Sequence, residues 1–112
     1  MQTTLQKTVR TGRSEALRPE KPRKLEEQLR DAIRERHYSK RTEEAYVMWY
    51  RQFIRFHRLR HPKDMGEAEV TAFLKHLTVD RDVAVETHRQ ALNALVFLFR
   101  RVLQRELEEI EL

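Results

Sequence analysis

The chain has 112 residues, which is enough for one small domain with a single core. Apolar residues make up 39% and charged residues 37%, and 23 lysines and arginines against 18 acids leave a net charge of +5. The positive charge lies in the first half of the chain. A basic half suggests a polyanionic partner, with nucleic acid ahead of a membrane surface. The alternative at this point is a basic helical domain whose charge serves only its solubility.

Composition also excludes several kinds of site. The chain contains no cysteine, which excludes disulfides and thiolate metal sites. No apolar run approaches the roughly 18 residues of a membrane span, and the first residues lack the apolar region of a signal peptide. We therefore expect a cytoplasmic protein with no membrane partner.

The beginning of the chain is expected to be disordered. Residues 1–21 are basic and have almost no apolar spacing, which predicts a mobile tail. The alternative is a basic arm that becomes ordered on DNA. A first helix is expected over Pro22–Arg36, because proline is tolerated in a first turn and Leu25, Leu29 and Ile33 recur at intervals of four.

The second expected helix, Lys40–His57, is the stretch around which the chain is organised. Ser39 and Thr42 are hydroxyl residues of the kind that cap a helix start. Aromatic residues then recur at steps of three and four, which predicts that they form core rather than stack on nucleobases. These residues are Tyr46, Trp49, Tyr50, Phe53 and Phe56. Lys40 and Arg41 place two cations beside the positive helix end, an arrangement that makes sense if an anion normally binds there.

Two further helices are expected after a turn at residues 61–66. The third spans Glu67–Leu77 and the fourth spans about Val85–Arg105. The fourth helix carries an apolar stripe at Leu92, Leu95, Phe99 and Val102, widened by Val96 and Phe97. Such a helix is usually packed between neighbours, or it meets another domain. With no repeat and no strand alternation, residues 22–105 predict an all-α, compact four-helix bundle, and residues 106–112 are expected to begin a linker.

A catalytic constellation is not evident. The sequence has neither a glycine-rich phosphate loop nor a Gly-x-Ser-x-Gly motif. His57 and His61 have a metal-ligand spacing, but Pro62 follows directly, so we predict a surface pair and neither a metal nor another cofactor. The carboxylates of Glu43 and Glu44 are expected on a solvated face. Catalysis by this chain alone is therefore not expected.

Four motifs occur in a specific order and spacing. They are Tyr-Ser-x-x-Thr-x-x-x-Tyr at 38–46, His-Pro at 61–62, Phe-Leu-x-x-Leu at 73–77 and Thr-x-x-x-Ala-Leu-Asn-Ala-Leu-x-Phe-Leu at 87–98. Together they resemble the N-terminal core-binding domain of tyrosine recombinases, and in particular the phage and integron integrases. The resemblance covers residues 25–103. One departure is at Val83–Glu86, where many members have a hydroxyl residue.

The resemblance implies an orthogonal, SAM-like helical fold and a role in DNA recombination. Members of the family hold duplex DNA between a helical N-terminal domain and a C-terminal domain that carries a tyrosine nucleophile. None of Tyr38, Tyr46 and Tyr50 matches that nucleophile. The resemblance thus implies the DNA-binding domain of a site-specific recombinase, of prokaryotic, phage or mobile-element origin, without its catalytic domain. The implied partners are double-stranded DNA, the catalytic domain of the same protein, and other protomers of a recombination complex.

The physical pattern and the resemblance agree on where DNA should bind. The predicted DNA-binding residues are Ser39, Lys40, Arg41, Thr42, Thr87, Gln90, Asn93, Ala94 and Arg101. The first four combine hydroxyls, cations and the N–H groups of a helix start, which suit a phosphate. The others are expected along the outward side of the fourth helix, except Asn93, which lies between its two faces. Gln90 can contact a phosphate or adenine. The alternatives are that Ser39 and Thr42 only cap their helix and that Gln90 is an ordinary surface residue.

Two other functions are open at this stage. The first is a helical protein–protein interaction domain that does not bind DNA and uses the apolar surface at Val96–Phe99. The second is a helix-turn-helix regulator, which is weakened because a whole helix separates the second helix from the fourth.

Overall fold

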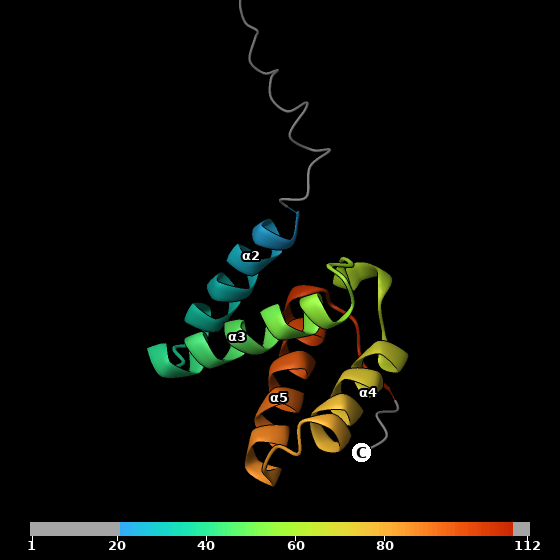
Figure 1. Ribbon diagram of the computed structural model, residues 1–112. Helices are drawn as coiled ribbons and strands as arrows, with labels where there is room; N and C mark the ends of the chain where they lie inside the picture. Colours follow the sequence, from blue (N-terminus) through green and yellow to red (C-terminus); the bar gives the residue numbers. More distant parts are fainter. Residues whose placement is uncertain (1–20, 109–112) are drawn as a thin grey trace, which may run out of the picture.

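The computed structural model describes residues 21–108, and within them the chain forms four α-helices and no β-strand (Figure 1). The helices are α2 (Lys21–Glu35), α3 (Lys40–Phe56), α4 (Glu67–Lys75) and α5 (Val85–Phe97). A 3-10 turn at Pro62–Asp64 precedes α4, and π-helical turns at His76–Asp80 and Leu98–Val102 extend α4 and α5. The all-α prediction is confirmed, although the last helical stretch ends at Val102 rather than at Arg105.

Two further sequence predictions concern a tail at the start of the chain and the absence of a membrane-spanning segment. The predicted tail lies outside the described residues except for Lys21, which begins α2. Within residues 21–108, no helix is both long and apolar enough to cross a membrane.

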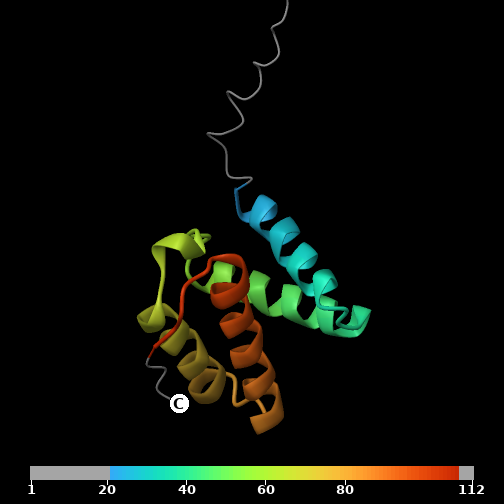
Figure 2. The same ribbon diagram turned by 180° about the vertical axis from the view of Figure 1, so that it is seen from behind.

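Helix α3 lies at the centre of the bundle and contacts α2, α4 and α5 (Figures 1 and 2). Its aromatic stripe forms the middle of the core through Trp49, Tyr50 and Phe53, which are buried as predicted. Tyr46 is only half-buried, and the prediction is wrong for Phe56, which is 38% exposed near the end of α3. The ring of Phe53 packs edge-on against Phe73 of α4 and Phe99 after α5, at centroid distances of 5.7 and 6.2 Å. Burial of these large rings is the main source of stability in such a small domain.

Helix α5 is buried on more than one side. Ala91, Ala94 and Leu95 are each at most 3% exposed. The following segment is buried as well, because Phe97 is 8% exposed and Leu98 and Phe99 are fully covered. Of the apolar surface that the sequence offers as a protein interface, Val96–Phe99, the last three residues are therefore packed inside this domain, and Val96 is half-buried.

The expectation that Glu43 lies on a solvated face is wrong, because its carboxylate is buried. The residue is 4% exposed, and its carboxylate accepts hydrogen bonds from Arg34 Nε and Nη2 (3.1 and 2.9 Å) and from Arg30 Nη1 (2.8 Å). These bonds from Arg34 and Arg30 lower the pKa of Glu43 to about 2. A second ion pair, between Arg51 Nη2 and Glu26 Oε2 at 2.7 Å, also joins α3 to α2. Charge pairing therefore supplements the apolar contact between these two helices.

The segment after the last helical turn folds back toward the start of α4. Arg105 Nη1 donates to the backbone oxygen of Met65 at 2.6 Å, and the guanidinium carbon lies 5.4 Å from the centre of the Phe99 ring. The backbone N–H of Glu108 donates to Glu67 Oε2 at 2.8 Å. The linker boundary at residue 106 stays a prediction, but contacts with the bundle continue through Glu108. We call residues 103–108 the return segment.

Candidate nucleic-acid interface

The amino end of α3 has the capping structure that the sequence predicts. Ser39 is extended (φ −67°, ψ 160°), and its Oγ accepts a hydrogen bond from the backbone N–H of Thr42 at 3.1 Å. The Ser39 hydroxyl also donates to Thr42 Oγ1 at 3.1 Å. This cap satisfies one of the backbone N–H groups that a helix start leaves without an intrahelical partner. The remaining backbone N–H groups of the first turn can still donate hydrogen bonds to an anion.

Lys40 and Arg41 are exposed beside this helix end. In the described part of the chain, neither has an ion-pair partner. Two unpaired cations next to the positive end of a helix dipole repel it, and a bound anion would relieve that repulsion. The electrostatics of this end therefore favour a negatively charged ligand.

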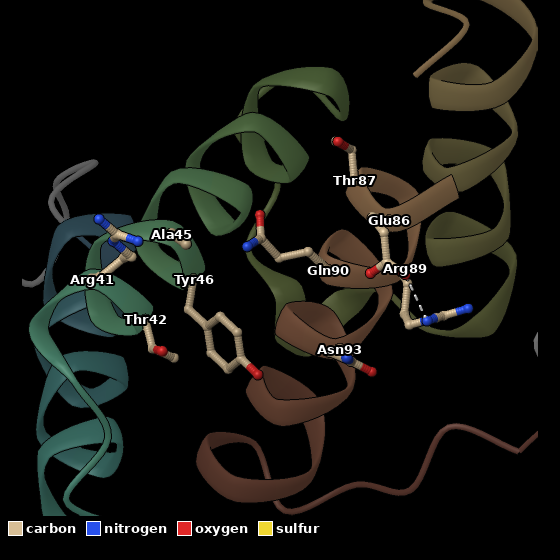
Figure 3. A pocket seen from close by; sticks show the side chains of 9 residues that line it. All are labelled: Arg41, Thr42, Ala45, Tyr46, Glu86, Thr87, Arg89, Gln90 and Asn93. Atoms are coloured by element: carbon tan, nitrogen blue, oxygen red, sulfur yellow. Dashed lines mark hydrogen bonds and ion pairs between the residues drawn. The ribbon is translucent and has the colours of Figure 1, made fainter. Parts of the chain in front are cut away.

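A groove of about 450 Å³ lies between the first turns of α3 and those of α5 (Figure 3). Five of the predicted site residues line it together: Arg41, Thr42, Thr87, Gln90 and Asn93. Four residues that the sequence analysis did not single out for this site complete the lining: Ala45, Tyr46, Glu86 and Arg89. The two predicted parts of the site, which are far apart in the sequence, thus form one surface.

The remaining predicted residues differ in their placement. Ser39 and Lys40 are exposed and adjoin the groove at the start of α3. Ala94 is only 3% exposed and packs in the core, so the expectation that it lies on the outward side of α5 is wrong. Arg101 is exposed in the π-helical turn after α5, and it does not line the groove.

Gln90 is held in place by a buried residue of the neighbouring helix. Trp49 Nε1 donates to Gln90 Oε1 at 2.9 Å; Trp49 is 3% exposed, whereas Gln90 is on the surface. Figure 3 shows the amide of Gln90 projecting into the groove, with its nitrogen on the side of Ala45. The two residues are 41 positions apart, so no local pattern in the sequence indicates this bond.

Tyr46 contributes an aromatic ring and a hydroxyl group to the groove. Its ring packs against Phe97 and Tyr38, with centroids 5.6 and 6.4 Å apart. Burial, with a smaller contribution from Tyr38, raises the pKa of the Tyr46 hydroxyl, so the group stays protonated and can donate a hydrogen bond. The acid in the groove, Glu86, pairs with Arg89 at 3.0 Å, which offsets its negative charge.

The histidines considered as a metal pair have other partners. His57 Nε2 lies 2.9 Å from the backbone oxygen of Glu69, and His61 Nδ1 accepts a hydrogen bond from the backbone N–H of Lys63 at 3.1 Å. Among residues 21–108, no group of three or more histidine, aspartate or glutamate side chains is placed to hold a metal ion. The groove between α3 and α5, which five of the predicted residues line, is therefore the candidate site of the described chain.

Comparison with known proteins identifies the family of the chain. The family described as phage integrase, N-terminal SAM-like domain, matches residues 25–109. Two curated proteins described as integrase/recombinase, from Escherichia coli and Pseudomonas aeruginosa, are each 56% identical over 84 residues. The match covers 75% of this chain and 25% of each relative, so the chain spans about a quarter of their length. The chain belongs to the family of N-terminal SAM-like domains of phage integrases.

Proposed function

We propose that this domain binds duplex DNA for a site-specific recombinase or integrase, and that it does so mainly through phosphates. The observation that carries the proposal is the grouping of unpaired cations, hydroxyls and a capped helix end along one groove. Lys40 and Arg41 supply the charge, and Ser39, Thr42 and Thr87 supply hydroxyls beside it. Cations, hydroxyls and backbone N–H groups at helix starts are the usual phosphate ligands of DNA-binding proteins.

The mode of binding follows from the small number of cations at the groove. Each neutralised phosphate releases counterions and adds about −0.9 to the slope of log affinity against log salt. With few such contacts, the isolated domain binds DNA modestly. Because this binding comes mainly from the phosphate contacts, added salt removes it. Tight and specific binding then requires the rest of the parent protein.

The role within the parent protein follows from the family. We assign cleavage and rejoining of DNA to another part of the parent protein, since the match covers only 25% of the length of each relative. This domain positions the recombination site for that chemistry, and its partners are the catalytic domain of the same protein and other protomers on the DNA. No tyrosine of the groove is assigned a nucleophilic role.

An NMR titration of the labelled domain with a short duplex, at low and at moderate salt, tests DNA binding. We expect shifts concentrated at the amides of residues 39–42 and 87–93, and we expect them to fade as salt is added. R41A should weaken binding, whereas R101A, which removes the same charge away from the groove, should weaken it much less. Amides that do not move at low salt, or an equal loss for R41A and R101A, would contradict the proposal.

A further inference from the structure

Trp49, the single tryptophan of the chain, is buried. The one polar atom of its side chain, Nε1, is directed at Gln90 in the wall of the groove. Its indole N–H can only donate a hydrogen bond, and Gln90 Oε1 accepts it at 2.9 Å. Leaving a buried N–H without an acceptor is costly, so the bond fixes which end of the Gln90 amide faces Trp49. The amide nitrogen, which carries two donors, is then the end directed into the groove (Figure 3).

This orientation limits what Gln90 can recognise. A bidentate contact with adenine needs the amide oxygen and the amide nitrogen side by side on an outward edge. Here one lone pair of the oxygen accepts the indole N–H, which holds that end of the amide against Trp49 and leaves the nitrogen as the end presented to the groove. Turning the amide over would break the bond to the indole and would be disfavoured by about tenfold.

We propose that Trp49 is a positioning residue that makes Gln90 a hydrogen-bond donor toward DNA. Gln90 then selects acceptor atoms on DNA, rather than the edge of adenine, which offers one acceptor and one donor. The acceptors can be phosphate oxygens or N7 and O6 of guanine. The inference rests on the proposed function of DNA binding at this groove. Trp49 itself is 3% exposed and touches no DNA; it acts through Gln90.

A double-mutant cycle tests the dependence of Gln90 on Trp49. We expect Q90A to weaken binding of a short duplex by about fivefold in the wild-type background and by less than about twofold in the W49F background. An equal factor in both backgrounds overturns the inference. If the Q90A factor is the same for all duplex sequences, the acceptor is a phosphate; if it requires a guanine at one position, the acceptor is that base. A requirement for adenine overturns the inference.

A second variant avoids any change in the core. Q90E keeps an acceptor for the indole N–H but replaces the amide donors by a charged oxygen. We expect Q90E to bind DNA more weakly than Q90A while the indole N–H resonance of Trp49 stays near its wild-type position. Binding by Q90E at the wild-type level overturns the inference, whether or not W49F folds.

The indole resonance also separates this inference from the proposed function, because the chain has one tryptophan and therefore one such signal. During titration of the wild-type domain with the duplex, we expect it to shift together with the amides of residues 39–42 and 87–93. If those amides shift and the indole signal does not, DNA binding stands and the role of Trp49 is wrong. If nothing shifts, both proposals are wrong.

Discussion

Replacing Glu43 by glutamine tests the charge contact that joins α2 to α3. The buried carboxylate accepts three hydrogen bonds from Arg30 and Arg34, and glutamine keeps its shape but removes its charge. The pKa of Glu43 is about 2 in the folded protein, against an ordinary value of 4.5. Because the folded-state pKa is depressed, the carboxylate stabilises the fold fully above pH 4.5, and this contribution is lost as the pH falls from 4.5 toward 2.

The size of the effect follows from the shift and from the exposure of the arginines. At roughly 1.4 kcal/mol per pKa unit, the whole shift corresponds to about 3 kcal/mol. The side chains of Arg34 and Arg30 are 60% and 29% exposed, so water screens both pairs and reduces this figure. We therefore expect E43Q to lower the free energy of unfolding by about 1–2 kcal/mol at neutral pH.

Urea unfolding, followed by far-UV circular dichroism at a series of pH values, measures this difference. The gap between wild type and E43Q should shrink below pH 4.5, because the wild-type carboxyl group then becomes protonated as well. E44Q is the matched control; Glu44 is exposed, and its replacement should change stability by less than about 0.5 kcal/mol. Equal stability of E43Q and wild type at neutral pH, or a gap that does not change with pH, would refute the reasoning.

R105A should lower the free energy of unfolding by about 1–2 kcal/mol in urea unfolding, because it removes the bond to Met65 and the contact with Phe99; an unchanged midpoint would contradict this. G66A should cost less than about 1 kcal/mol in thermal unfolding, since a Cβ there would lie 3.1 Å from Nη2 of the flexible Arg105 side chain; a loss as large as that of R105A would show that Arg105 cannot move aside. K40A/R41A should reduce the salt slope of DNA binding by about two, and an unchanged slope would place the phosphates elsewhere.

The helices could be predicted from the sequence because their signals are local. Apolar steps of three and four mark the buried side of α3, and Ser39 with Thr42 marks its start. The length of the last helical stretch was less predictable. The apolar pattern continues through Leu103, but the π-helical turn ends at Val102, and the chain then turns back through Gln104, whose φ of 57° is left-handed.

The site was predicted in outline, and the errors arise where tertiary packing decides. Ala94 belongs to a helix that is buried on more than one side, and a small side chain gives little sign of which side it occupies. Glu43 looks like an ordinary acid of a first helical turn, and its partners lie on the preceding helix. The bond between Trp49 and Gln90 joins residues 41 positions apart. Each of these features exists only once two helices have packed together.

The return segment has a mechanical consequence. Its residues are fastened to the beginning of α4, through Arg105 on Met65 and through Glu108 on Glu67. A pull on the chain beyond Glu108 would therefore load these two attachments and the turn before α4. The strain would reach α5 only after they give way. The groove between α3 and α5 is thus separated from that end of the described chain by two attachments, both of them on the segment that begins α4.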